Sequence, residues 1–598
     1  MQIGGYSPYT AGTRGGRSRI RLPEFSSGTK KVLFIVLGVI IGIFLILYIS
    51  LGELRFFANH YMRLTWFSKN YLVLLQNNYE SRPGGGFITA YGNLDTFLGW
   101  PTNLSFNNSY EIDTPTYVNP PYPHEEMLKN EWYEGYTFRD ANWEPSFPDA
   151  TPALIEFYKK KFPDRDVDGI IVVNFTMIED LVERLGEITV NGQTYTKDNL
   201  FSAVTNTVND VDRHDEEALA SRKNILGDLS AVIMGKAKMH PFKAKAAVIK
   251  ALNDKDMYFW FASKGMEDKV ISKGWANAIT VPENTDMLAV NIANLGSKKA
   301  DRYLAKEVHY YVNLTKEVPE ATVEITVRYP GFKNNFADDY KGYLQLVIPA
   351  DASFNEALSD SHVSVQGNLQ IIGEKIILPA GSKTTFSYTY KLPRNYFNPD
   401  EYQLRLIRQS GDEKYYWVTV ETSPDRMMQS EDFDARENRA MFFGKLDEDK
   451  DLSLTMLPDK SPPYPIEQVF SDINTISIYW NEPIDEATGK DVTNYVIKDM
   501  NVTDSNVTDE VKVVYAEIVD GSVSKLEIEG ATAQSLERYQ IELKAIRDNA
   551  LNTIVPDPKI ITVVQRLNGV VAATETPAAE TPATEAPATT ETPAVTEE

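Results

Sequence analysis

The sequence predicts a multidomain chain with a single N-terminal transmembrane helix, an α/β head domain, two β-sandwich domains and a disordered tail. The first observation is an uncharged, apolar run at residues 32–52. The second is the alternation of strand-like and helix-like segments up to residue 297, which is the pattern of a layered α/β domain. The third is a series of short β-rich runs after residue 298, separated by Gly and Pro, as in antiparallel sandwiches. The length of 598 residues agrees, because single cores rarely grow beyond about 250–300 residues.

The apolar run at residues 32–52 contains 21 residues. As a helix it would be about 31 Å long, close to the thickness of a bilayer core. Basic residues dominate the segment before it, so the positive-inside rule places the N-terminus in the cytoplasm. A cleaved signal peptide is the alternative, but the run is longer than a signal-peptide core, and the only echo of a cleavage site, at residues 50–52, is weak. The sequence therefore predicts a single-pass protein of the cell membrane whose C-terminal bulk is extracytoplasmic.

The composition excludes several classes of protein. The formal net charge is −24, whereas nucleic-acid binding needs a basic face, so no nucleic-acid partner is expected. The chain has no cysteine, which excludes disulfides and thiolate metal sites. The stability of the exported part must therefore come from large hydrophobic cores, and this composition suits a bacterial surface protein.

Changes in composition and periodicity divide the chain into segments. The predicted segments are a disordered basic cytoplasmic segment at 1–31, the transmembrane helix at 32–52, a helical stalk at 53–69, the α/β head at 70–297, a β-sandwich at 298–421, a linker at 422–461, a second β-sandwich at 462–566 and a disordered tail rich in Thr, Pro, Ala and Glu at 567–598. The tail has no Lys or Arg and cannot bury enough apolar area to fold.

Two buried strands and one well-marked helix are the clearest elements of the head. Residues 71–75 and 168–174 are apolar runs of strand length. The helix that follows the second run is stopped by Gly186. From residue 215 to about 264 the pattern is helical, with a break expected at Pro241.

The most distinctive stretch is the loop at residues 77–86, which reads Asn-Asn-Tyr-Glu-Ser-Arg-Pro-Gly-Gly-Gly and follows a buried strand. In a functional interpretation the glycines let the backbone approach a ligand, and their N–H groups cradle an anion beside Arg82. In a structural interpretation the same glycines form a tight turn between two strands, and Arg82 is a solvated loop residue. Glycines are common in turns between strands, so the spacing alone favours the turn.

A second motif, at residues 138–145, contains the adjacent Arg139 and Asp140 before Trp143. Asp140 could hold the guanidinium of Arg139 toward a phosphate or a carboxylate. A structural Arg–Asp pair that shields Trp143 explains the motif equally well. Arg222 belongs to a later predicted helix, where a charged side chain usually lies on a solvated face.

These motifs provide the candidate site residues. The catalytic candidates are Arg82, Arg139, Asp140 and Arg222, and the candidate ligand-binding residues are Glu80, Arg82, Gly84, Gly85, Gly86, Arg139, Asp140, Asn142 and Arg222.

No metal site is predicted. The acidic run at residues 447–451 imitates a calcium loop, but Leu452 and Pro458 occupy the glycine and glutamate positions of that loop. A looser calcium site between the β modules stays open on ligand type alone. The six histidines are far apart in sequence, with no pair at metal-binding spacing.

The loop at 77–86 resembles the signature of a bacterial envelope family, domain of unknown function 4012. The matching residues are Asn77, Asn78, Glu80, Arg82, Pro83, Gly85, Gly86 and Phe87, then Arg139, Asp140, Asn142 and Trp143 with Phe147 and Pro148, Asp168 and Gly169, and Asn294, Gly296 and Lys298 with Ala300 and Asp301. The resemblance covers roughly residues 70–420 and implies a membrane-anchored extracytoplasmic protein without an established activity. The segment at 462–566 resembles a bacterial immunoglobulin-like (Ig-like) surface domain through its motifs at 480–483, 493–495 and 547–549.

A weaker resemblance bears on mechanism. The order of anchor, apolar strand, arginine-bearing loop, Arg-Asp pair and later helical arginine is similar to that of the LytR-CpsA-Psr glycopolymer transferases. This resemblance implies that Arg82, Arg139 and Arg222 clamp the pyrophosphate of a lipid-linked polymer and that aspartates hold magnesium.

The chain departs from the transferase pattern where that family has an aspartate after its first strand, because Asn77 and Asn78 stand there. Glu80, Asp95 or Asp140 would have to replace that aspartate. No cofactor is otherwise expected, and Mg²⁺ is expected only if the transferase alternative holds.

The expected function is that of a single-pass cell-envelope protein whose α/β head binds an anionic or glycan ligand. A cell-wall glycopolymer or a lipid-linked anion fits this expectation, and the membrane is the other expected partner. One alternative is a phosphoryl or glycopolymer transferase that acts on a lipid-pyrophosphate-linked polymer. Another is a surface adhesion or scaffold protein. Catalysis depends on whether Arg82, Arg139 and Arg222 converge in one cleft.

Overall fold

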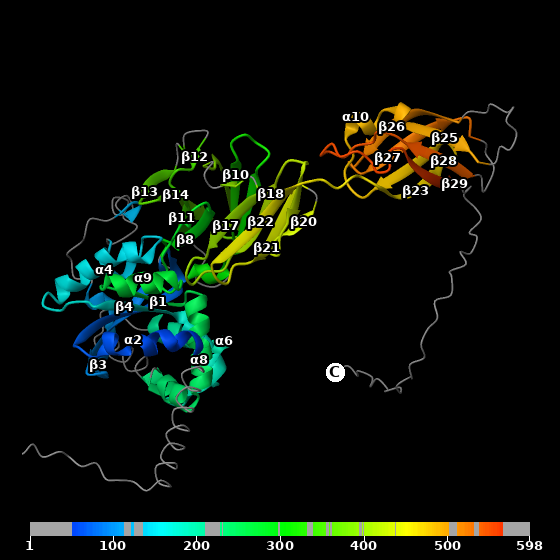
Figure 1. The fold of residues 1–598 in the computed structure, drawn as a ribbon. Coiled ribbons are helices and arrows are strands. Elements are labelled where there is room, and N and C mark those ends of the chain that lie inside the picture. The colour runs from blue at the N-terminus through cyan, green and yellow to red at the C-terminus, as the bar shows by residue number, and fades with distance from the viewer. Residues whose placement is uncertain are drawn as a thin grey trace, which may run out of the picture.

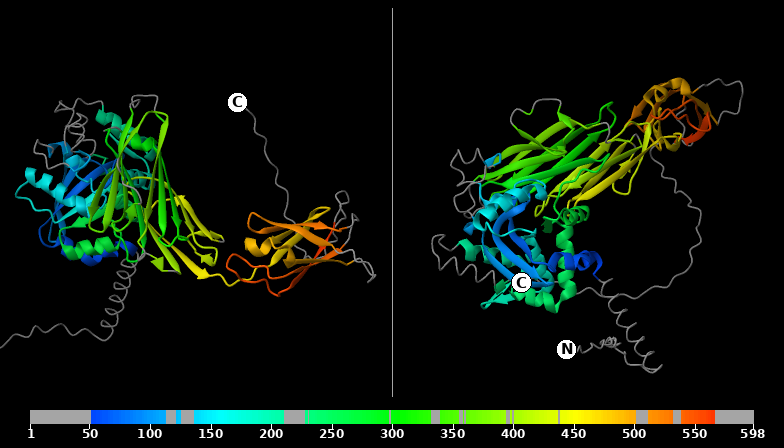
Figure 2. Two further views of the ribbon diagram at one scale, coloured as in Figure 1. Left: turned by 90° about the horizontal axis from the view of Figure 1, so that it is seen from above. Right: turned by 60° about the vertical axis from the view of Figure 1, so that its left-hand side comes forward.

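The computed structural model describes residues 51–112, 121–124, 136–209, 228–229, 231–296, 299–331, 339–354, 358, 361–393, 397–398, 400–436, 438–500, 511–531 and 538–565. They form an N-terminal head, a large β-sandwich and a smaller C-terminal β domain, which follow one another in Figure 1. Two further views in Figure 2 show the sandwich between the other two parts. The predicted anchor at 32–52, except for its last two residues, and the predicted tail lie outside the described residues. Within the described part, no helix is long and apolar enough to cross a membrane.

The head is built on a five-stranded sheet with the strand order β3-β2-β1-β4-β7. Its strands are β1 (Lys69–Arg82), β2 (Gly85–Phe97), β3 (Trp100–Asn108), β4 (Gly169–Asn174) and β7 (Met257–Phe261). Strands β1 and β4 are parallel, and the other neighbouring pairs are antiparallel. A parallel pair needs a crossover connection, and the segment that contains α4 (Phe147–Lys161) provides it.

Helices cover both faces of this sheet. Successive side chains of a strand point to opposite faces, and apolar side chains of β1 lie on both, so each face needs a covering layer. Leu72 and Leu74 of β1 face α4 and the short helix η3 (Phe138–Asp140) in one hydrophobic cluster. Tyr71 faces the other way, toward α2 (Arg55–Thr65) and α9 (Lys264–Ser272). A further cluster joins α5 (Phe175–Leu185), α6 (Lys197–Asn209), α8 (Pro241–Asn253) and the hairpin of β5 (Ile188–Val190) and β6 (Gln193–Tyr195). The layered α/β head predicted from the sequence is confirmed.

Two features of the head differ from the predictions. The segment at 53–69, expected to be a stalk, begins with η1 (Gly52–Leu54) and contains α2, which packs on the head through the buried Phe56. The helical pattern expected from 215 to 264 is interrupted by β7, a strand whose aromatic side chains are covered on both faces of the sheet. Aromatic residues fit strands as well as helices, so a short apolar run does not distinguish the two.

The β-sandwich consists of two sheets around the largest hydrophobic cluster. In order across the first sheet lie β12 (Ser353–Phe354), β15 (Ser382–Lys391), β10 (Glu320–Tyr329), β9 (Ala305–Asn313), β18 (Tyr415–Glu421), β21 (Arg439–Lys445) and β20 (Asp434–Arg436). Across the second lie β13 (His362–Gln366), β14 (Leu369–Leu378), β11 (Tyr340–Pro349), β8 (Asp286–Asn294), β17 (Glu401–Ile407), β22 (Lys450–Pro458) and β19 (Arg426–Gln429), with β16 (Phe397–Asn398) beside β17.

The sandwich is larger than the predicted segment 298–421. Strand β8 begins at Asp286, and all nine of its residues are buried in the middle of the second sheet. Strands β19 to β22 occupy most of the segment 422–461, which was expected to be a linker. Strand β22 alternates exposed charged or polar residues with buried Leu452, Leu454 and Met456. The charged residues of this segment led to the linker prediction. That prediction was wrong, because alternate residues of β22 point into the sandwich core.

The C-terminal domain packs two smaller sheets around its own cluster of apolar side chains. One sheet has the order β23 (Pro465–Asp472), β24 (Thr475–Trp480), β27 (Val523–Glu529) and β26 (Lys512–Val519). The other has β25 (Tyr495–Asp499), β28 (Arg538–Leu543) and β29 (Lys559–Val564), and the connections include α10 (Glu486–Gly489) and η6 (Val492–Asn494). A second β domain after the sandwich is therefore present.

Candidate functional site

The glycine loop of the sequence motif is a tight turn between β1 and β2. The backbone N–H of Gly84 donates to the carbonyl of Asn142 at 3.1 Å, and that of Gly86 donates to the side-chain carbonyl of Gln76 at 3.1 Å. A Cβ on Gly84 would lie 2.8 Å from the Asn142 carbonyl oxygen, and one on Gly86 would lie 2.4 Å from the carbonyl carbon of Asn77. Glycine is required here by close backbone approach. The backbone N–H groups of Gly84 and Gly86, which could have bound an anion, instead donate hydrogen bonds within the protein.

Arg82 is one of the largest fully buried side chains, with 1% of its surface exposed. Its Nε and Nη2 donate to Oδ1 of Asp140 at 2.9 and 2.7 Å, and its Nη1 donates to the carbonyls of Ser81 at 2.9 Å and Asn294 at 2.7 Å. Asp140 is also buried and accepts from the hydroxyl of Thr137 at 3.2 Å. The aspartate of the second motif therefore holds Arg82, and the two ionised groups satisfy each other in the interior.

A buried polar cluster links this part of the head to the sandwich, and we call it the polar junction. Its members are Ser81, Arg82, Asp140, Asn174, Asn294, Asp301, Gln409 and Ser410.

Gln409 is the main sandwich residue of the polar junction. Its Nε2 donates to the Ser81 hydroxyl and to the carbonyls of Arg82 and Ile292, each at 3.1 Å. Asn174, at the end of β4, donates to the hydroxyl of the neighbouring Ser410 at 2.9 Å. Such networks of buried hydrogen bonds hold packed elements in one arrangement.

Asp301 completes the polar junction from the short helix η4 (Ala300–Tyr303). Its Oδ2 accepts from the backbone N–H of Ser81 at 3.1 Å and from Nδ2 of Asn294 at 2.7 Å. Burial raises the pKa of this carboxyl, and the positive charge of Lys306 and the two hydrogen bonds oppose the rise.

A buried ionic group lies beside the polar junction in the sandwich. Asp412 accepts from Lys306 at 2.5 Å and from Lys414 at 2.6 Å. Burial alone would raise the pKa of Asp412, but the two ammonium groups hold it well below its usual value. Burial lowers the pKa of Lys414 to about 8, against the opposing charge of Asp412. Lys414 also donates to Oε1 of Gln409 at 2.8 Å, so this ionic group orients the junction.

The structure brings Arg82, Asp140, Asn142 and the three glycines together, but as interior groups. Arg139 is half-buried, and its guanidinium carbon lies 4.0 Å from the ring centroid of Tyr110 and 5.5 Å from that of Phe87. It is therefore oriented by aromatic faces, and Asp140 turns instead to Arg82. Arg222 lies outside the described residues.

The outer side of the same motif carries a second cluster, which we call the outer cluster. The guanidinium carbon of the exposed Arg302 lies 4.9 Å from the ring centroids of both Tyr79 and Phe201. The hydroxyl of Tyr79 donates to Oε2 of Glu179 at 2.7 Å. Burial raises the pKa of Glu179, and the hydrogen bond from Tyr79 and the charge of Arg302 oppose the rise. The arrangement offers a cation beside a pair of aromatic rings, next to a hydroxyl–carboxylate pair.

Glu80 lies between the polar junction and the outer cluster. It is buried, which raises its pKa, while the charges of Arg82 and Lys299 oppose the rise. The sequence did not single out Arg302, although Arg302 directly follows the motif residues Ala300 and Asp301. Only the position of α6 beside η4 reveals its aromatic neighbour Phe201 (ring centroid 4.9 Å).

In the acidic run at 447–451, Asp447, Asp449 and Asp451 are each ion-paired with a basic side chain. Among the described residues, Asp459, Glu482 and Asp548 could hold a metal ion, since one carboxylate oxygen of each lies within 4.8 Å of the others. Burial raises the pKa of Glu482 to about 7, and the charges of Asp459 and Asp548 add to the rise.

Comparison with known proteins yields one family. Residues 68–208 match the family described as "Protein of unknown function (DUF4012)", which confirms the family resemblance for the motifs within that range. No curated protein matches the chain.

Several solved structures share limited fold similarity. One is the N-terminal part of the bacterial S-layer protein SbsC, at 13% identity and a TM-score of 0.16, covering 18% of this chain and 24% of that chain. Another is the Lin1025 protein from Listeria innocua, at 14% identity and a TM-score of 0.19, covering 35% of this chain and 78% of that one. The chain thus spans about a quarter of the S-layer fragment, and these low scores carry no argument about function.

Proposed function

We propose, from the premise that residues 68–208 form a DUF4012 domain, that this chain is a single-pass envelope protein whose extracytoplasmic head binds an anionic glycan without transforming it. The observation that carries this proposal is the 1% exposure of Arg82, whose guanidinium is taken up by Asp140 and two carbonyls. The motif residues around Arg82 then have a structural role, because their hydrogen bonds hold the head against the sandwich. Ligand binding falls to the groups that remain on the surface.

Anchoring is proposed from the uncharged run at 32–52 and the basic segment that precedes it. The run ends at Gly52, where η1 begins, and α2 starts at Arg55. The membrane would therefore lie immediately before the head. The sandwich and the C-terminal domain follow the head in the chain, so they belong to the extracytoplasmic part.

The outer cluster fits the proposed ligand. Arg302 is exposed beside the two rings, and its planar guanidinium can receive a phosphate or a carboxylate in bidentate fashion. Beside it, the half-buried Tyr79 donates its hydroxyl to the buried Glu179, and its phenolic oxygen can still accept from a glycan hydroxyl. A ligand with both anionic and hydroxyl groups uses the whole cluster, as an anionic envelope glycopolymer does.

The transferase alternative is weakened by the same geometry. Its clamp needs Arg82 in an open cleft, whereas Arg82 is buried. Two of the three carboxylates that would replace the missing magnesium ligand are ion-paired, Asp140 with Arg82 and Asp95 with Arg165, and the third, Glu80, is buried. We therefore favour binding over phosphoryl transfer.

Binding is tested with the full-length chain in detergent micelles and two probes, a phosphate-bearing envelope glycan and a polyprenyl pyrophosphate. We expect Arg302→Ala to weaken binding of the glycan by about tenfold or more, because a charge-assisted hydrogen bond is lost. The matched control is Arg436→Ala on the sandwich, which removes an exposed arginine whose side chain is 75% exposed. Equal affinity of Arg302→Ala and the wild type would refute the assigned site.

Two further readouts separate the parts of the proposal. Retention of the chain in the membrane fraction after alkaline carbonate tests the anchor independently of any ligand. Incubation with the lipid-linked polymer and Mg²⁺ tests for catalysis, and a transferred product would refute the non-catalytic assignment.

A further inference from the structure

An exposed apolar surface lies where α2 meets the tip of the β2–β3 hairpin. We call it the aromatic rim, and its members are Tyr61, Trp66, Phe67, Phe97, Leu98 and Trp100. Their exposed fractions range from 41% for Trp66 to 74% for Trp100. A folded protein rarely leaves contiguous aromatic groups in water without a partner, so the rim marks an interaction surface.

Hydrogen bonds make the aromatic rim a single rigid surface. The backbone N–H of Leu98 donates to the carbonyl of Trp66 at 2.9 Å, and that of Gly99 donates to the carbonyl of Thr65 at 3.1 Å. The hydroxyl of Tyr61 also donates to the Gly99 carbonyl. The hairpin tip therefore closes the C-terminal end of α2.

The hairpin itself adds a second pair of side chains to the rim. Phe97 and Trp100 are direct partners across β2 and β3, so their side chains lie side by side on one face. Both are more than half exposed, at 51% and 74%. The apolar groups are thus held outward by regular secondary structure.

The rim lies close to the point where the apolar run at 32–52 ends. That run stops at Gly52, and α2 covers Arg55–Thr65. Eleven helical residues extend about 16 Å, so the rim is within about one helix length of the end of the proposed membrane span. No flexible linker separates them, because η1 leads directly into α2.

The start of α8 adds basic charge near the same point. A Cβ on Gly52 would lie 3.6 Å from Nζ of Lys245, which places α8 beside the chain at this position. On the same helix Phe242 is 74% exposed, three residues before Lys245 and next to Lys243. Phe242 and Lys245 also line a groove that contains Asp447 and Glu448 of the sandwich. The start of α8 therefore adds an aromatic ring and lysines near the end of the apolar run, and the acidic residues of the groove belong to the sandwich side.

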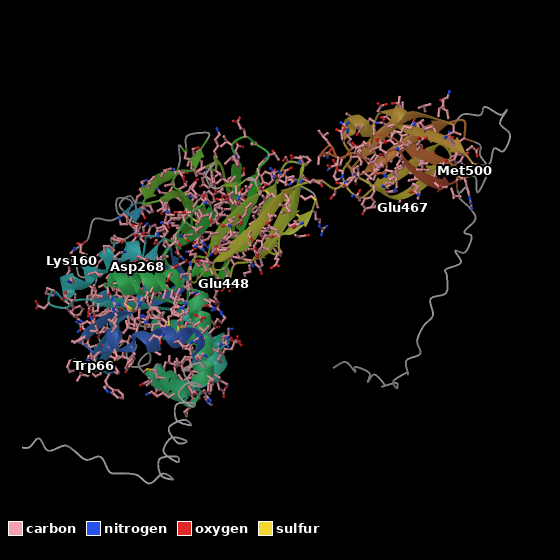
Figure 3. All side chains as sticks on the ribbon, in the orientation of Figure 1. Trp66, Lys160, Asp268, Glu448, Glu467 and Met500 are labelled. Atoms are coloured by element: carbon pink, nitrogen blue, oxygen red, sulfur yellow. The ribbon has the colours of Figure 1, made fainter. Side chains whose placement is uncertain are left out.

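The aromatic rim lies on one side of the head. Figure 1 places α2 and β3 on the side that faces away from the sandwich, and Trp66 is labelled on that side in Figure 3. Helix α8 leads from Gly52 toward the sandwich, where Lys255, just beyond its C-terminal end, pairs with Asp449. A flat membrane could therefore approach the aromatic rim without meeting the β domains.

We propose that this side of the head lies in the outer interface of the bilayer that residues 32–52 cross, with the aromatic rim at headgroup depth. Trp and Tyr favour this depth, because their rings are apolar and their N–H and O–H groups still reach polar partners. The inference rests on the proposed anchor and goes beyond it. The head is fixed against the membrane, and the sandwich projects from it.

The absence of cysteine allows single-site labelling of the full chain. Leu98→Cys and Trp100→Cys each receive an environment-sensitive fluorophore, and each protein is reconstituted into vesicles of phosphatidylcholine and phosphatidylglycerol. Lipids with a nitroxide on the acyl chain then quench any probe at the interface. The matched control is Phe443→Cys, which replaces an aromatic residue of the sandwich that is 61% exposed.

We expect the nitroxide lipids to reduce emission by about half or more at positions 98 and 100 and by less than about a tenth at position 443. Probes at 98 and 100 that behave like the control would overturn the inference. Probes shielded from aqueous iodide but insensitive to nitroxide lipid would overturn it as well, because a second copy or another segment of the chain would then cover the rim. Carbonate extraction of the same vesicles reports the anchor separately, so a retained chain with solvent-exposed probes refutes the docking and leaves the anchor intact.

Discussion

Arg82 donates through its guanidinium to acceptors on three elements, β1, β8 and η3. Burying an ion pair costs desolvation energy on both sides, so the pair contributes little net stability by itself. Removing one partner is different, because it leaves the other charge buried without compensation. The exposed fractions of Arg82 and Asp140, both 1%, therefore decide what a substitution would do.

We expect Arg82→Ala to lower the free energy of unfolding of the head and sandwich by about 3–5 kcal/mol, because the Asp140 carboxylate remains buried. The matched control is Arg405→Ala, which removes a bidentate pair with Asp451, a residue whose side chain is 67% exposed, and should cost at most about 1 kcal/mol. Denaturant unfolding of both variants measures the difference. An Arg82→Ala protein of wild-type stability that no longer binds ligand would instead support the binding role predicted from the sequence.

Gly86 is a residue of the turn at which backbone atoms leave no room for a side chain. An added Cβ would lie 2.4–2.5 Å from backbone atoms of Asn77 and Asn78. We expect Gly86→Ala to destabilise the head by about 1–3 kcal/mol or more, as overpacking does. The helical Gly235 has no atom within 4 Å of an added Cβ, so Gly235→Ala should be neutral or stabilising by up to about 1 kcal/mol. Thermal unfolding of the pair provides the measurement, and equal effects would contradict the packing explanation.

At the scale of elements, β7 and α9 are connected by a buried carboxyl group. Oε2 of Glu267, in the first turn of α9, accepts from the backbone N–H of Phe261 at 2.7 Å. Burial raises the pKa of Glu267 to about 7, although this hydrogen bond opposes the rise. The group therefore binds a proton more tightly in the folded state than in the unfolded state.

This difference predicts a pH dependence of stability. The pKa of the carboxyl is 4.5 in the unfolded chain and about 7 in the folded one, so its stabilising contribution is complete below pH 4.5 and is lost as the pH rises through 7. Glu267→Gln should flatten the melting temperature of the head in this pH window, whereas Glu156→Gln, on the exposed part of α4, should not. A wild-type slope retained in Glu267→Gln would show that another group titrates there.

At the scale of the whole molecule, the head and the sandwich share a hydrophobic cluster. It joins Trp143 and Leu154 of the head to Ala293, Leu295 and Tyr343 of the sandwich side. The polar junction crosses the same boundary. The C-terminal domain differs, because its cluster draws its members from residues 470–563 alone.

We therefore expect two calorimetric transitions in the full-length chain, one for the head with the sandwich and one for the C-terminal domain. Gln409→Ala should lower the temperature of the first transition only, because Gln409 bonds to both parts of the unit. Trp480→Ala should lower only the second, since Trp480 is 3% exposed within the C-terminal core. Three separate transitions, or a shift of both by either variant, would contradict this division.

Part of the fold could be predicted because its signals are local. The buried strand at 71–75, the helix that ends before Gly186 and the alternating strands of the sandwich follow from periodicity in short windows. Strand β8 fell within the head because the predicted boundary was placed at residue 297, where the short β-rich runs begin. Only its neighbours β11 and β17 show that it belongs to the sandwich.

The candidate site could be predicted only in part. The motif residues are indeed brought together, since Arg82, Asp140, Asn142 and Asn294 contact one another or the same turn. Whether such a group faces solvent or the interior depends on residues more than 200 positions away, and no window of sequence contains that information. Arg302 is the opposite case, an exposed residue that no motif singled out. Its ring partners, Tyr79 of β1 and Phe201 of α6, come from distant parts of the sequence.

The sequence alone determined the family resemblance, the layered α/β head and the succession of β domains, because each depends on local residue types and their spacing. The tertiary structure decided the roles of the charged residues. Arg82 is engaged in the interior, and Arg302 is available at the surface, because burial is a property of the assembled chain. A charge is functional or structural according to what surrounds it, and packing brings those surroundings from distant parts of the sequence.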